Sequence, residues 1–249
     1  MKKFAVVLAG CGHKDGSEIQ EAVTLLLAID QHGCEYQCFA PNRLKADVID
    51  HLAGKPVKED RNIMTEAARI ARGNILPLEA FKAEDYDALF FPGGFGAAKN
   101  LCDYAFKGEA MEVKPDVARV ILEMHEAGKP IGAMCIAPVM LARLIPDVCV
   151  TLGTEGAPVT DEVRSWGANH VQTENGDVCA DNEKKVEATG SWYDLEVVTM
   201  LSFGQPALIN GTIKLFARAT PNLSLRSSVP NVQVCPSTSN LTLGYFFMN

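Results

Sequence analysis

The chain has 249 residues, of which 47% are hydrophobic, and its formal net charge is −8. This is enough for one large domain with a full core, and the charge excludes nucleic acid and anionic membranes as main partners. No apolar stretch approaches the ~18 residues of a membrane-spanning helix. The apolar run after Lys2-Lys3 is too short for a signal peptide, so we expect a cytoplasmic protein.

The eight cysteines are expected to be free thiols, because a cytoplasmic chain is kept reduced. No two of them have the CxxC spacing of zinc sites, so we expect no structural metal. Cys34 and Cys38 fall on one face of an expected strand, where packing explains both.

Strands and helices alternate along the chain, which predicts an α/β fold with a doubly wound, mostly parallel sheet and helices on both faces. The expected strands cover residues 4–9, 35–40, 86–91, 130–134 and 148–152. The first expected helix begins at a capping box formed by Ser17 and Gln20 and ends at Gly33. Further helices are expected at 63–71, 115–126, 137–145 and 158–166. Residues 42–60 are polar and irregular, and we expect them to form a segment outside the main sheet with a short helix or a hairpin. Residues 171–189 are expected to form β-structure with a hairpin turn at Asn175-Gly176.

The composition changes near residue 201. Residues 1–201 contain 20 basic and 31 acidic residues, a net charge of −11, and form the expected domain. Residues 202–249 contain only three charges, all basic, and are rich in Ser, Asn, Thr and Pro. We therefore expect 202–249 to be an atypical, loosely ordered tail.

Cys135 is the strongest candidate for a chemical role. It lies between the expected strand 130–134 and a helix with Pro138 in its first turn. A cysteine at such a joint sits on a sharp turn above the sheet, as in a nucleophile elbow, and the helix N-terminus favours its thiolate. The alternative is a cysteine that merely packs in the core.

Backbone N–H groups near Cys135 are candidates for an oxyanion hole. Gly93 and Gly94, after the third expected strand, allow the backbone to approach a ligand, and the N–H of Ile136 follows the nucleophile. An ordinary turn also explains two successive glycines.

Glu18, in the first turn of the first helix, is the candidate proton-transfer group. A carboxylate that stabilises the helix start explains it equally well, and Glu21, one turn further on, is the second choice. His13, in the loop after the first strand, either lines the cleft or is a solvated loop residue. Lys99 and Asn100 either line the cleft or cap the next helix.

Several ordered stretches together resemble the ElbB-type branch of the PfpI and class I glutamine amidotransferase-like superfamily. The resemblance covers about residues 1–190 and is carried by Ala9–Gly12, Asp15–Ile19, Arg61–Asn62, Glu66–Ile70, Pro92–Leu101 and Gly128–Pro138.

The resemblance implies a flavodoxin-like sandwich that forms a homodimer and works without a cofactor or metal. It also implies weak, glutathione-independent glyoxalase (lyase) activity on small aldehydes, giving glycolate from glyoxal and lactate from methylglyoxal. In that chemistry Cys135 adds to the aldehyde, Glu18 moves a proton through an enediol, and the N–H groups of Gly94 and Ile136 hold the oxyanion. The family's isoprenoid biosynthesis label comes from the resemblance alone.

The chain departs from the wider superfamily in two places. The deglycase branch of this superfamily has a histidine after the strand that corresponds to 148–152, where this chain reads Leu152-Gly153-Thr154-Glu155. The sequence after Leu201 does not match the family pattern. Three alternatives follow: a slow glyoxalase, a redox sensor or partner-binding protein with an oxidisable Cys135, and an amidotransferase domain. The last is disfavoured because no Cys-His pair is evident.

Overall fold

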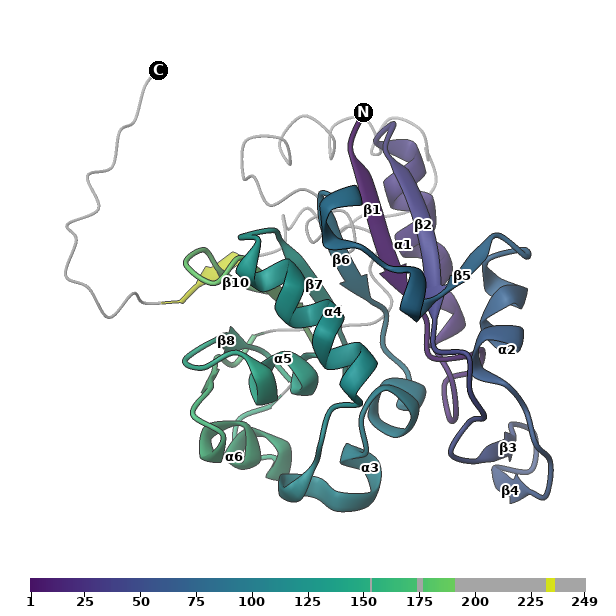
Figure 1. Ribbon diagram of the computed structural model, residues 1–249. Helices are drawn as coiled ribbons and strands as arrows, with labels where there is room; N and C mark the ends of the chain where they lie inside the picture. The colour runs from purple at the N-terminus through teal and green to yellow at the C-terminus, as the bar shows by residue number, and fades with distance from the viewer. Residues whose placement is uncertain (153, 174–176, 191–231, 236–249) are drawn as a thin grey trace, which may run out of the picture.

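The computed structural model describes residues 1–152, 154–173, 177–190 and 232–235. An eight-stranded sheet, in the order β12-β10-β11-β7-β6-β1-β2-β5, forms its centre (Figure 1). Every pair of neighbouring strands is parallel except β10 and β11. The predicted doubly wound α/β fold is therefore confirmed. The strands of this sheet are β1 (Lys3–Val7), β2 (Glu35–Ala40), β5 (Ile75–Pro77), β6 (Ala88–Phe91), β7 (Ile131–Met134), β10 (Val178–Asp181), β11 (Val186–Thr189) and β12 (Val232–Val234).

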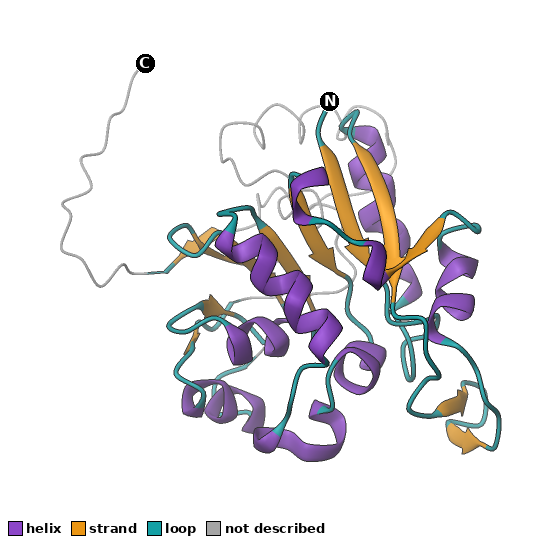
Figure 2. Cartoon of the chain, viewed as in Figure 1, coloured by secondary structure: helices purple, strands orange, loops and turns teal. Residues whose placement is uncertain are grey.

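Helices cover both faces of the sheet (Figure 2). On one face α4 and α5 pack with Phe91 and Ile131 in the larger hydrophobic cluster, and on the other α1 and α2 pack with Phe4 and Phe90. None of the helices in the described ranges is both long and apolar enough to span a bilayer. The helices are α1 (Ile19–Gln31), α2 (Ile63–Ile70), α3 (Tyr104–Lys107), α4 (Pro115–Glu126), α5 (Pro138–Leu144) and α6 (Pro158–Ser165), with a π-helical turn at Ala97–Leu101.

Two small sheets lie outside the central one. Residues 42–60 contain the antiparallel pair β3 (Val48–Asp50) and β4 (Lys55–Val57), so of the two alternatives expected there, a short helix or a hairpin, the hairpin forms. The strand expected at 148–152 forms only as β8 (Cys149–Val150), which pairs with β9 (Asn169–His170) instead of joining the central sheet.

One turn prediction, the capping box at Ser17, needs correction. Glu18, not Ser17, caps α1, because the Ser17 hydroxyl accepts the N–H of Ala9 at 2.8 Å. The connection between β10 and β11 runs through residues 182–185, where the carboxylate of Asp181 accepts two backbone N–H groups. Residues Asn175 and Gly176, where we placed the turn, lie outside the described residues.

The loop after β1 is fixed by polar groups buried beneath it. The Lys45 ammonium lies 2.7 Å from the Asp15 carboxylate, and each side chain is 2% exposed. The same carboxylate accepts the N–H of Ile49 at 2.7 Å. This pair anchors the 42–60 segment to the loop that leads into α1, and so helps to position the start of that helix.

Candidate active site

Cys135 lies on the sharp turn between β7 and α5. Its φ of +56° is in the left-handed region, which non-glycine residues seldom occupy outside functional or strained sites. Its N–H donates to the carbonyl of Thr189, the last residue of β11, at 2.9 Å. The predicted strand–turn–helix context of this cysteine is therefore present.

Two backbone N–H groups donate hydrogen bonds to the Cys135 sulfur, those of Gly94 and Ile136. Burial nevertheless raises the pKa of the thiol to about 11, and the negative charge of Glu21 adds to the rise. Our expectation of an activated thiolate fails here, because loss of solvation outweighs the N–H groups that favour the anion.

Glu21, on the first turn of α1, is the carboxyl group at this cysteine. Its side chain is buried, and its Oε2 accepts the N–H of Gly93 at 2.5 Å. Its Oε1 is buried without a hydrogen-bond partner among the described residues. Burial raises the pKa of Glu21 to about 8, the nearby charge of Glu18 adds to the rise, and the Gly93 N–H opposes it.

Gly93 brings the two groups together. A Cβ at this position would lie 2.4 Å from both the Cys135 Cβ and the Glu21 Oε2, so no residue with a side chain fits between them. A Cβ at Gly94, whose φ is +95°, would likewise lie 2.4 Å from the backbone nitrogen of Glu18. These approaches put the oxyanion candidates Gly93, Gly94 and Ile136 around the cysteine, as the loop positions suggested.

Glu18 has a different task in the structure. Its Oε2 accepts the N–H of Glu21 at 2.7 Å, which makes it the N-cap of α1. The negative charge of Glu18 still acts on the site, because it contributes to the raised pKa values of Glu21 and Cys135. The structure thus places the second-choice residue, Glu21, in the position that we had expected Glu18 to hold.

Asn100 and His13 support the loops around the site. The Asn100 side chain is buried, donates to the carbonyls of Ala9 and Asp15, and accepts the N–H of Ala46. The carbonyl of His13 accepts the N–H of Phe95 at 2.7 Å. Both residues therefore tie the glycine loop and the loop after β1 into one unit.

Several histidines of the described ranges have their ring contacts away from the cysteine. The rings of His13 and His51 pack edge to face at 5.2 Å, and His170 contacts Glu155 and the N–H of Leu152. No hydrogen bond links a histidine to Cys135 within these ranges. The structure thus gives no support to the Cys-His pair of an amidotransferase.

The raised pKa of Glu21 predicts that the wild type loses stability relative to Glu21→Gln as pH rises from about 4.5 to 8. In this interval the unfolded chain ionises freely, whereas the folded protein must keep the proton or bury a charge. The two proteins should match near pH 4.5 and differ by roughly 2–4 kcal/mol at pH 8, with the variant more stable. Urea unfolding at several pH values measures this difference, and parallel curves would contradict the raised pKa. Glu187, which has a similar pKa of about 8, contributes equally to both proteins.

Comparison with known proteins now places the chain in a family. No family model matches it. It is 40% identical over 222 residues to the human "Glutamine amidotransferase-like class 1 domain-containing protein 3, mitochondrial", covering 86% of this chain and 83% of the relative. The chain belongs to the class I glutamine amidotransferase-like family. A rat member, "ES1 protein homolog, mitochondrial", is 43% identical over 86% of this chain and 84% of its own.

Solved structures agree with this assignment. An isoprenoid biosynthesis protein with an amidotransferase-like domain from Ehrlichia chaffeensis is 34% identical and superposes with a TM-score of 0.73, covering 84% of this chain and 99% of that one. A DJ-1 superfamily protein from Salmonella typhimurium shares the fold at 17% identity and a TM-score of 0.54, covering 87% and 98% of the chains. The flavodoxin-like fold and the superfamily inferred from the motifs are thus confirmed.

Two expectations, one about cellular location and one about the cysteines, need correction. We expected a cytoplasmic protein, but curated relatives from human, rat and zebrafish are all named mitochondrial, which points to that organelle instead. We also expected only free thiols, whereas the sulfurs of Cys149 and Cys235 are joined in a disulfide. The composition contains no signal for the location. The disulfide joins cysteines that are 86 residues apart, which their spacing does not predict.

Proposed function

We propose that this class I glutamine amidotransferase-like protein is a slow, glutathione-independent glyoxalase that converts small 2-oxoaldehydes into 2-hydroxy acids. The observation that carries the proposal is the pairing of Cys135 with Glu21 across Gly93, because it sets a nucleophile beside a carboxyl group that exchanges protons near neutral pH.

The proposed reaction begins at sulfur. The Cys135 thiol adds across the aldehyde C=O, so that a C–S bond forms and the thiol proton ends on oxygen as a hemithioacetal. The N–H groups of Gly94 and Ile136, which already point at the sulfur, are placed to stabilise negative charge on that oxygen.

Glu21 then moves one proton between two carbons. In its ionised form the carboxylate takes the proton from the carbon bonded to sulfur, which leaves an enediol. It returns the proton to the adjacent carbon, and a thioester of the 2-hydroxy acid results. Water cleaves this thioester, releases glycolate or lactate, and restores the thiol. With a pKa of about 8, Glu21 is present in both protonation states at neutral pH, as a group that accepts and returns a proton requires.

Slow turnover follows from the same electrostatics. A thiol with a pKa of about 11 is almost entirely protonated at neutral pH, so few molecules hold the reactive thiolate at a given moment. The same property weighs against the redox-sensor alternative, since sensor cysteines are accessible and have low pKa values.

The test is the production of glycolate from glyoxal and of lactate from methylglyoxal, without glutathione, by purified wild type. We expect slow but measurable turnover that Cys135→Ala abolishes. Cys34→Ser, which changes a partly buried thiol at the edge of the fold, serves as the matched control and should retain full activity. Equal rates for wild type and Cys135→Ala would exclude the proposal for these substrates.

The names of the relatives lead us to propose a mitochondrial location. The homodimer implied by the family resemblance stays a prediction, which the molecular mass in solution tests.

A further inference from the structure

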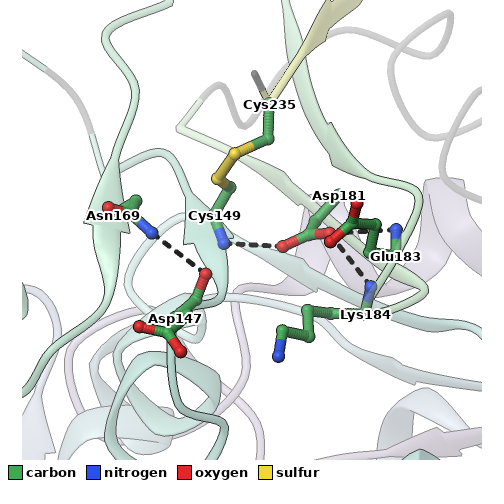
Figure 3. Close-up of a disulfide and its surroundings, with 7 residues drawn as sticks. All are labelled: Asp147, Cys149, Asn169, Asp181, Glu183, Lys184 and Cys235. Carbon is green, nitrogen blue, oxygen red and sulfur yellow. Dashed lines mark hydrogen bonds between the residues drawn. A yellow bond between two sulfur atoms is a disulfide. The ribbon is translucent and has the colours of Figure 1, made fainter. Parts of the chain in front are cut away.

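A disulfide fastens the last described strand to the body of the protein (Figure 3). Cys149 belongs to β8 and is fully buried, whereas Cys235 directly follows β12. Their Cα atoms are 6.1 Å apart and their positions in the chain differ by 86 residues. The bond thus joins two segments that are far apart in the sequence.

Among the described residues, the other attachments of this strand are backbone hydrogen bonds to β10. β12 pairs with β10 through three residues, Val232 to Val234, and the N–H of Cys235 extends the ladder to the Ala180 carbonyl at 3.2 Å. It lies at the edge of the sheet, and the Val234 side chain is 56% exposed. A three-residue edge strand forms only a few backbone hydrogen bonds, so the covalent bond is the main attachment that the described residues provide.

Asp181 lies beside the two sulfurs, and hydrogen bonds from the backbone hold its carboxylate there. Its Oδ2 accepts the N–H of Cys149 at 2.9 Å, and its Oδ1 accepts the N–H groups of Glu183 and Lys184 at 3.1 and 3.0 Å (Figure 3). One of its oxygens and both sulfurs lie within 4.8 Å of one another.

The same three groups also have the ligand types of a metal site. The hydrogen bonds to Asp181 favour the disulfide, because both of its carboxylate oxygens already accept backbone N–H groups. A thiolate-bound metal is therefore the outcome that the test must exclude.

We propose that Cys149 and Cys235 form a reversible redox clasp, separate from Cys135, that controls whether β12 covers the edge of β10. Oxidation by a small-molecule disulfide such as glutathione disulfide removes two electrons and two protons from the two thiols. The S–S bond forms in the protein, and the oxidant leaves as two thiols. A dithiol reverses the exchange, β12 separates from β10, and the edge N–H and C=O groups of β10 become exposed to solvent.

The experiment uses the full chain carrying Cys135→Ala, so that the outcome does not depend on the proposed catalysis. The protein is equilibrated with glutathione disulfide or with a dithiol, alkylated, and mapped by mass spectrometry, and hydrogen exchange is followed at residues 178–180 and 232–234. We expect a Cys149–Cys235 cross-link after oxidation, and exchange at least about tenfold faster after reduction.

Matched variants separate the bond from its neighbourhood. Cys149→Ser and Cys235→Ser should each reproduce the fast exchange without reductant, whereas Cys34→Ser should leave both segments protected. Alkylation of both thiols after equilibration with glutathione disulfide would overturn the proposal. Unchanged exchange after reduction, or a stoichiometric zinc ion that protects both thiols, would do the same.

Discussion

Glu21→Gln is expected to lower the rate of glycolate formation from glyoxal by about 10²–10⁴-fold without unfolding the protein. The glutamine carbonyl still accepts the N–H of Gly93, so the contact that positions α1 against the glycine loop remains. An amide cannot take a proton from carbon and return it, and the proposed enediol step therefore fails. The measurement is kcat and KM for glyoxal, with the melting temperature at pH 5 as a check on folding.

Glu18→Gln is the matched control for this change. It makes the same substitution one helical turn away, keeps an oxygen that accepts the N–H of Glu21, and removes only a charge that acts from a distance. We expect its rate to stay within a few-fold of wild type. If Glu18→Gln abolishes turnover and Glu21→Gln does not, the proton-transfer role belongs to Glu18, as the family resemblance alone suggested.

Lys45→Met is expected to destabilise the protein by about 3–5 kcal/mol. The substitution leaves the Asp15 carboxylate, which is 2% exposed, without its cationic partner and keeps a side chain of similar length. The cost is the burial of an unpaired charge, and urea unfolding at neutral pH measures it.

A double variant distinguishes the lost ion pair from lost packing. Adding Asp15→Asn to Lys45→Met removes the unpaired charge and keeps an acceptor for the N–H of Ile49. The double variant should recover much of the stability that the single variant loses. A double variant that is less stable than Lys45→Met would show that packing, not charge, accounts for the loss.

The sequence was most informative where a local pattern and the tertiary fold favour the same backbone conformation. Cys135 follows a short apolar run and precedes Pro138, and this order alone predicts its turn between β7 and α5. The bounds of α4 and β2 were predicted for the same reason, since their periodicity and flanking residues agree with their burial.

The carboxyl group at the site was harder to identify because the two candidates differ by one helical turn. Glu18 and Glu21 both lie at the start of α1, and which of them reaches Cys135 depends on which residue caps the helix. Ser17 has the residue type of a cap, but its hydroxyl is used by the N–H of Ala9, a partner eight residues away. Such a contact leaves no signal in a local pattern.

The ionisation of Cys135 was wrongly predicted for a related reason. Position at a helix start indicates a lowered thiol pKa, whereas the burial that raises it comes from chain segments brought together by the fold. The Cys149–Cys235 bond likewise depends on β12 reaching β10, which no spacing of cysteines shows.

The coupling between Cys135 and Glu21 is the central claim, and the pH dependence of Cys135 alkylation tests it most directly. The rate constant for reaction with iodoacetamide, followed by mass spectrometry of the peptide that contains Cys135, reports the thiolate fraction at each pH. We predict a thiol pKa of about 11 in the wild type and a clearly lower value in Glu21→Gln, because the variant removes a negative charge that opposes the thiolate. Coincident profiles for the two proteins would show that the carboxyl group does not sense the sulfur, and would contradict the account.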